Sequence, residues 1–142
     1  MLSQLAPLNT MAYLLIIDDD EDFASSVATV CQAAGHEVLV AHSPAQGLTR
    51  VTERRPDAVL LDVMFPEDPS AGFQVARDIR RRFGDIPILL LTAVNQQFPL
   101  GFSQKDIDPK LLPVVDFVEK PVDFTLLLEK VSHLLAAKVA AA

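Results

Sequence analysis

The chain has 142 residues, half of them apolar, which is the size and composition of one domain that can bury a core. Its net charge of −7 argues against a general nucleic-acid binder, because phosphate contacts need clustered Lys and Arg. The single cysteine, Cys31, excludes an internal disulfide framework and a cysteine metal cluster. This cysteine content fits a cytoplasmic protein, and no membrane contact is expected because no apolar run approaches the roughly 18 residues of a membrane span.

Five short, mostly apolar runs predict β-strands that are largely buried on both faces, because they lack a regular polar alternation. They are Tyr13–Ile17, Glu37–Ala41, Ala58–Leu61, Ile88–Leu91 and Val114–Val118.

The segments between these runs show helical spacing of apolar residues. Helices are predicted over Phe23–Ala34, from Pro44 to about Arg54, over Phe73–Phe83 and after a capping Asp123. In the last helix the predicted buried residues are Phe124, Leu127, Leu128, Val131 and Leu135. Residues 93–113 have no clean period, and an irregular or shortened fourth helix is expected there.

Strands that alternate with helices predict an α/β fold, a doubly wound five-stranded parallel sheet with helices on both faces. The predicted organisation is an N-terminal extension over residues 1–12, one domain over 13–137 and a tail over 138–142.

Polar side chains stand where the predicted strands end. Asp18 and Asp19 follow the first strand, Asp62 the third and Thr92 the fourth, and Lys120 comes shortly after the fifth. In open α/β sheets, ligands bind outside the carboxyl ends of the strands, so these groups are expected to converge.

Such a set of groups suits phosphoryl transfer. Three close carboxylates repel one another, and a hard divalent cation such as Mg²⁺ relieves that repulsion. The Lys120 ammonium and the Thr92 hydroxyl can each contact a phosphoryl oxygen. One carboxylate can then act as a nucleophile toward phosphorus.

Four runs at these strand ends carry a family resemblance: Leu14–Asp20, Pro56–Pro66, Leu89–Ala93 and Phe117–Pro121. Together and in this order they resemble the receiver domain of two-component response regulators, similar to the chemotaxis regulators. The resemblance covers about Tyr13 to Leu135 and implies a flavodoxin-like strand order 2-1-3-4-5.

The resemblance implies a role for each matching residue. Asp62 would be the phospho-acceptor, assisted by Lys120 and Thr92. Asp18, Asp19, Asp62 and the backbone carbonyl of Met64 would hold Mg²⁺. Thr92 and Phe117 would form the conformational switch.

The function that follows from the resemblance is that of a stand-alone, single-domain response regulator, a phosphoprotein of signal transduction rather than an enzyme. It would take its phosphoryl group from a sensor histidine kinase or a phosphotransfer protein of a phosphorelay. It would then bind an unknown downstream protein in a phosphorylation-dependent way. Family analogy leaves a homodimer through the last strand and helix open.

Other interpretations compete with these. The acidic run Asp18–Asp22 could be a solvated helix start, and Phe117 could be a core residue. A receiver-like module could bind partners without phosphorylation. An aspartyl-nucleophile phosphatase of the haloacid-dehalogenase type is disfavoured, because that group needs a second acid where Met64 stands.

Overall fold

The protein is built around a five-stranded parallel sheet with the strand order β2-β1-β3-β4-β5. The computed structural model describes residues 12–62, 71–93, 114–120 and 122–141. The strands are β1 (Tyr13–Ile17), β2 (Glu37–Ala41), β3 (Ala58–Asp62), β4 (Ile88–Ala93) and β5 (Val114–Lys120). Every neighbouring pair is parallel, which confirms the predicted fold class and strand order.

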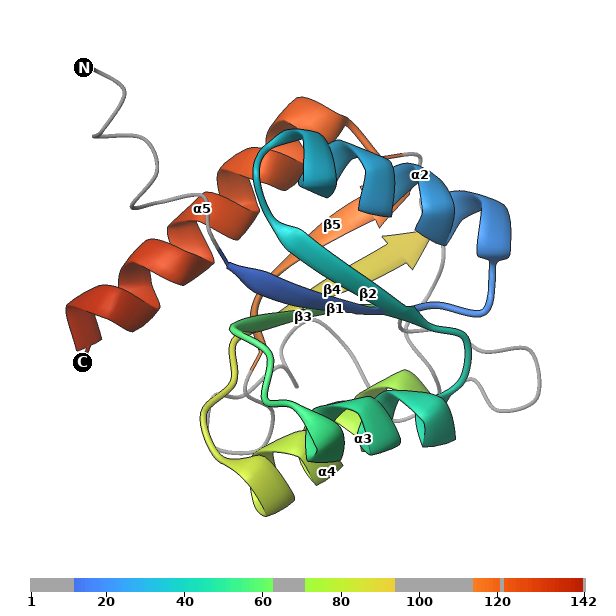
Figure 1. Ribbon diagram of the computed structural model, residues 1–142, viewed down its shortest axis with the longest axis vertical. Coiled ribbons are helices and arrows are strands. Elements are labelled where there is room, and N and C mark those ends of the chain that lie inside the picture. The colour runs from blue at the N-terminus through green and yellow to red at the C-terminus, as the bar shows by residue number, and fades with distance from the viewer. Residues whose placement is uncertain (1–11, 63–70, 94–113, 121, 142) are drawn as a thin grey trace.

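Helices lie on both faces of this sheet (Figure 1). They are α2 (Glu21–Ala33), α3 (Pro44–Glu53), α4 (Ala71–Phe83) and α5 (Phe124–Ala141). Helices α2 and α5 cover one face, and α3 and α4 cover the other (Figure 1). The helix expected over residues 93–113 falls almost wholly outside the described residues. No helix in the described part of the chain is long and apolar enough to cross a membrane.

The sheet is apolar on both faces, as the uninterrupted strand sequences predict. In β1, Leu14 and Ile16 pack beneath α2 and α5, whereas Leu15 and Ile17 pack toward α3 and α4. Strands β3 and β4 alternate in the same way between the two layers. Because successive strand residues point to opposite faces, one central sheet supplies two cores.

The close packing of α3 on the sheet depends on a residue without a side chain. A Cβ atom on Gly47 would lie 2.5 Å from Cδ1 of Ile17, a distance that atoms in contact do not reach. The helix begins at the predicted place, because Ser43 accepts a hydrogen bond from the Gln46 N–H and Pro44 follows it. Gly47 therefore sets how closely α3 approaches β1.

The amino ends of the strands are tied together by the start of β1. The Tyr13 N–H donates to Asp57 Oδ2 and the Asp57 N–H donates to the Tyr13 carbonyl, both at 2.8 Å. The Arg54 guanidinium lies 4.0 Å from the centre of the Tyr13 ring and forms two hydrogen bonds to the Glu37 carboxylate, at 2.6 and 2.9 Å. These contacts hold β1, β2 and β3 in register, so their carboxyl ends meet at the opposite edge.

The prediction for the buried face of α5 was partly wrong. Leu127 and Val131 are buried as expected, but Phe124 is 37% exposed, and Leu134, which was not predicted, is buried. Leu128 and Leu135 are half-buried. Helix α5 carries apolar residues around much of its circumference, so more than one stripe at helical spacing fits its sequence.

Candidate functional site

Three aspartates gather at the carboxyl edge of the sheet. Asp18 directly follows β1, and its N–H donates to the carbonyl of Ala41 at the end of β2, 3.0 Å away. Asp62 is the last residue of β3. One carboxylate oxygen from each of Asp18, Asp19 and Asp62 lies within 4.8 Å of the others. Asp18 and Asp62 are buried, whereas Asp19 is exposed, so the cluster opens to solvent through Asp19.

Lys120 brings the positive charge of this site. It ends β5, and its Nζ atom lies 3.3 Å from Asp18 Oδ2 and 3.7 Å from Asp62 Oδ1. Its side chain is 23% exposed. The ammonium therefore reaches both buried carboxylates at once. We call Asp18, Asp19, Asp62 and Lys120 the strand-end site.

The turn between β1 and α2 holds the aspartates in place. The Asp20 N–H donates to Asp18 Oδ1 at 2.9 Å. Asp20 is also the N-cap of α2, and its own Oδ1 accepts from the Phe23 N–H at 3.0 Å. Two of these acids therefore have structural roles besides any role as ligands. Asp18 fixes the turn through the Asp20 N–H, and Asp20 caps α2, because an N-cap acid satisfies helix N–H groups that lack partners.

Burial raises the pKa of Asp18 above its ordinary value. The hydrogen bond from the Asp20 N–H and the Lys120 ammonium lower it, and the neighbouring Asp19 raises it. Burial therefore disfavours the ionised form of the Asp18 carboxyl, and a cation bound beside it would favour that form.

The donor set fits a hard divalent cation. Mg²⁺ prefers carboxylate oxygens and keeps several waters, so it binds through few protein ligands at an open site. Three carboxylate oxygens close together, with one exposed residue among them, meet both conditions.

The remaining predicted site residues are placed only through the backbone, or not at all. Thr92 lies in β4, and its register partner in β5 is Glu119. Phe117 lies in β5 opposite Leu90. Met64 falls outside the described residues, so its predicted backbone ligand is untested.

Phe23 was predicted only as the first residue of a helix, with no role at the site. The Lys120 Nζ atom lies 4.2 Å from the centre of the Phe23 ring. No local pattern in the sequence indicated that Phe23 would contact a lysine 97 positions later in the chain.

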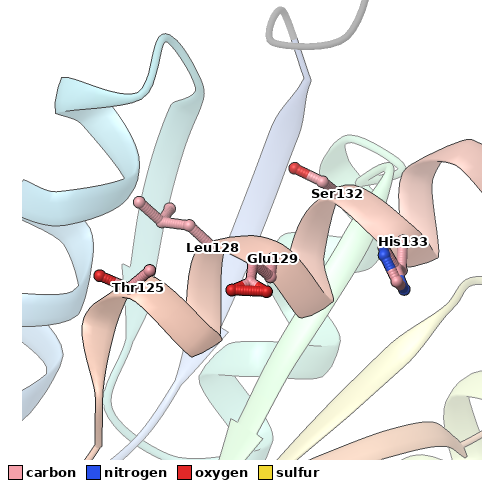
Figure 2. Close-up of a pocket in the computed structure, with 5 residues that line it drawn as sticks. All are labelled: Thr125, Leu128, Glu129, Ser132 and His133. Carbon is pink, nitrogen blue, oxygen red and sulfur yellow. The ribbon is translucent and has the colours of Figure 1, made fainter.

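A separate groove lies along α5 (Figure 2). The described residues that line it are Thr125, Leu128, Glu129, Ser132 and His133, all from this one helix. None of them belongs to the strand-end site, so this groove is not the place where the aspartates and the lysine converge.

Comparison with known proteins places this arrangement in a family. The family model for the response regulator receiver domain matches residues 14–132. The chain is 34% identical over 125 residues to the transcriptional regulatory protein AfsQ1 of Streptomyces coelicolor, covering 88% of this chain and 52% of that protein. The chain therefore spans about half the length of this curated relative.

Two further relatives are matched over nearly their whole length. The protein PilH of Pseudomonas aeruginosa is 27% identical, with 89% of this chain and 99% of that protein covered. The crystal structure of the chemotaxis protein CheY4 of Vibrio cholerae superposes with a TM-score of 0.74 at 27% identity, covering 88% of this chain and 99% of that one. With the family match over most of its length, the chain belongs to the response regulator receiver domain family.

Proposed function

We propose that this chain accepts a phosphoryl group on Asp62 and that Lys120, Asp18 and Asp19 assist the transfer. The observation that carries the proposal is the position of the Lys120 ammonium, within 4 Å of carboxylate oxygens on both Asp18 and Asp62. A cation at this place can contact an oxygen of a phosphoryl group attached to Asp62, because the same carboxylate is its neighbour. Membership of the receiver family supports the assignment.

Asp18, Asp19 and Asp62 are the described residues that would hold Mg²⁺, together with the backbone carbonyl of Met64. Bound Mg²⁺ supplies positive charge that offsets the negative charge of a phosphoryl group beside the carboxylates. Asp18 is fixed by the Asp20 N–H and Asp62 by its strand, so the ligands are positioned before the cation arrives.

The transfer itself is a displacement at phosphorus. A carboxylate oxygen of Asp62 forms the new O–P bond, and the bond from phosphorus to the donor breaks, so the electron pair of that bond leaves with the donor. The product is an acyl phosphate on Asp62. Lys120 offers its N–H groups to a phosphoryl oxygen, and Thr92 is the residue that we assign to a second oxygen.

The donor and the target are proteins in this proposal. Receiver domains take part in two-component signalling, so a histidine kinase or a phosphotransfer protein is the proposed donor. Phosphorylation would act through Thr92 and Phe117 to change binding to a downstream protein. Such a domain is regulatory, although its own residues promote the transfer.

The test separates an acceptor from an enzyme that turns over. The purified chain is incubated with Mg²⁺ and either acetyl phosphate or p-nitrophenyl phosphate, and released phosphate and protein mass are followed together. The proposal predicts a mass increase of one phosphoryl group with acetyl phosphate and no multiple turnover of the monoester. Many equivalents of nitrophenol per protein would instead indicate a phosphatase.

A further inference from the structure

The side chain of Lys120 has a third neighbour besides Asp18 and Asp62. Its Nζ atom lies 4.2 Å from the centre of the Phe23 ring, within the range in which a cation is attracted to the face of an aromatic ring. Phe23 belongs to the first turn of α2, whereas Lys120 ends β5. The contact therefore joins two elements that are distant in sequence, at the edge where the strands end.

Phe23 is held through both its backbone and its side chain. The Phe23 N–H donates to the side chain of the N-cap Asp20, and its half-buried ring packs against the apolar cluster beneath α2 and α5. Its position is thus set before Lys120 meets it.

The contacts among Asp18, Asp20, Phe23 and Lys120 form a closed ring of interactions. Asp18 accepts from the Asp20 N–H through Oδ1, Asp20 accepts from the Phe23 N–H, the Phe23 ring meets the Lys120 ammonium, and that ammonium returns to Asp18 Oδ2. A lysine side chain has four rotatable bonds and is partly exposed here, so each partner of the ammonium, the Phe23 ring as well as the two carboxylates, narrows the range of positions that it samples.

We propose that Phe23 is a positioning residue for Lys120: its ring holds the ammonium beside Asp62, where it can receive a phosphoryl oxygen. This inference rests on the proposed function of Asp62. The ring acts on the position of the Lys120 ammonium before transfer. Losing the ring should therefore slow the transfer step more than it weakens the binding of Mg²⁺ or of the donor.

The experiment compares Phe23→Leu and Phe23→Tyr with the wild type. Leu keeps apolar bulk without an aromatic face, whereas Tyr keeps the face. Phe83→Leu is the matched control, because Phe83 is also half-buried but packs in the other layer, toward α3 and α4. The rate of phosphorylation is measured against acetyl phosphate concentration at saturating Mg²⁺, and the Mg²⁺ affinity of each variant is measured by calorimetry.

The expected result is a maximal rate roughly three- to tenfold lower in Phe23→Leu, near that of the wild type in Phe23→Tyr, and unchanged in Phe83→Leu. The donor concentration at half-maximal rate and the affinity for Mg²⁺ should change little. A role in packing alone would lower the stability of Phe23→Leu without lowering its maximal rate selectively.

A second readout needs neither Mg²⁺ nor phosphorylation. In the metal-free protein, the ε-methylene protons of Lys120 should resonate upfield of ordinary lysines because of the ring current of Phe23, with the signal assigned by its loss in Lys120→Arg. The upfield shift should disappear in Phe23→Leu and remain in Phe23→Tyr. A shift that survives in Phe23→Leu would overturn the inference.

The two proposals fail in different ways. If the wild type takes up no phosphoryl group, the proposed function fails and the catalytic part of the inference falls with it. If the wild type is labelled but Phe23→Leu is labelled at the same rate, or Phe23→Tyr is as slow as Phe23→Leu, only the inference is overturned.

Discussion

The Nζ atom of Lys120 lies 3.3 Å from Oδ2 of Asp18, a residue 102 positions earlier in the chain. Asp18 is fully buried, so this ion pair lies where water screens it little. Through this contact Lys120, at the end of β5, joins the strand-end site to Asp18, which follows β1.

Replacement of Lys120 by Met should destabilise the metal-free protein by about 2 kcal/mol, because it leaves two buried carboxylates without their cation. Added Mg²⁺ should restore much of the loss. Urea unfolding with and without Mg²⁺ measures both effects. The control is Arg81→Met, which removes an exposed ion pair to Asp78 and should change stability by less than about 0.5 kcal/mol. Equal losses in the two variants would contradict this account.

Asp19→Asn should weaken the binding of Mg²⁺ about tenfold, because it removes the exposed carboxylate of the cluster. Since a ligand that binds only the folded state raises the melting temperature, the increase in Tm on adding Mg²⁺ should shrink accordingly. The matched control is Asp22→Asn, which removes another exposed acid of the same run outside the cluster. An undiminished increase in Tm in Asp19→Asn would show that Asp19 is not a ligand.

Much of the fold could be predicted from the sequence, because its strands are uninterrupted apolar runs. Strands β1 and β2 have the predicted bounds. Strands β3, β4 and β5 extend past their apolar runs to Asp62, Ala93 and Lys120. Backbone pairing continues there regardless of side chain, with Asp62 opposite Leu91 and Ala93 opposite Lys120, so a pattern of hydrophobicity ends too early.

The site was predictable in part for the same reason. Parallel strands bring their carboxyl ends to one edge, which predicts that Asp18, Asp62 and Lys120 meet there. The contact between Phe23 and Lys120 depends on the rotation of α2 about its axis, which helical spacing does not set finely enough. The exposure of Phe124 was missed likewise, because α5 has apolar residues on several sides.

Gly47→Ala should destabilise the protein by about 1–3 kcal/mol, because its Cβ would overlap with Ile17 unless α3 moves. In a double-mutant cycle, Ile17→Val removes the nearest atom and should recover part of this loss. Gly84→Ala is the contrast: at φ +88° it costs about 1 kcal/mol of backbone strain, but no atom lies within 4 Å of its Cβ. The prediction fails if Ile17→Val relieves neither variant or relieves both alike.

The stability of the protein should depend on pH through Cys31. Burial raises the pKa of its thiol from 9.0 to about 11. Between these values the unfolded chain loses the proton while the folded chain keeps it, so stability is present below pH 9 and is lost as pH rises. Relative to Cys31→Ala, the free energy of unfolding should fall by about 2 kcal/mol between pH 8 and pH 10.5. Parallel pH profiles for the two proteins would refute this.

The central claim is that Asp62 accepts the phosphoryl group, and intact mass after incubation with Mg²⁺ and acetyl phosphate tests it most directly. The account predicts one added phosphoryl group in the wild type and in Asp85→Ala, an exposed aspartate outside the site, and none in Asp62→Ala. Chelation of Mg²⁺ should abolish the labelling of the wild type. An adduct that persists in Asp62→Ala, or no adduct in the wild type with either acetyl phosphate or a phosphorylated histidine kinase, would contradict the account.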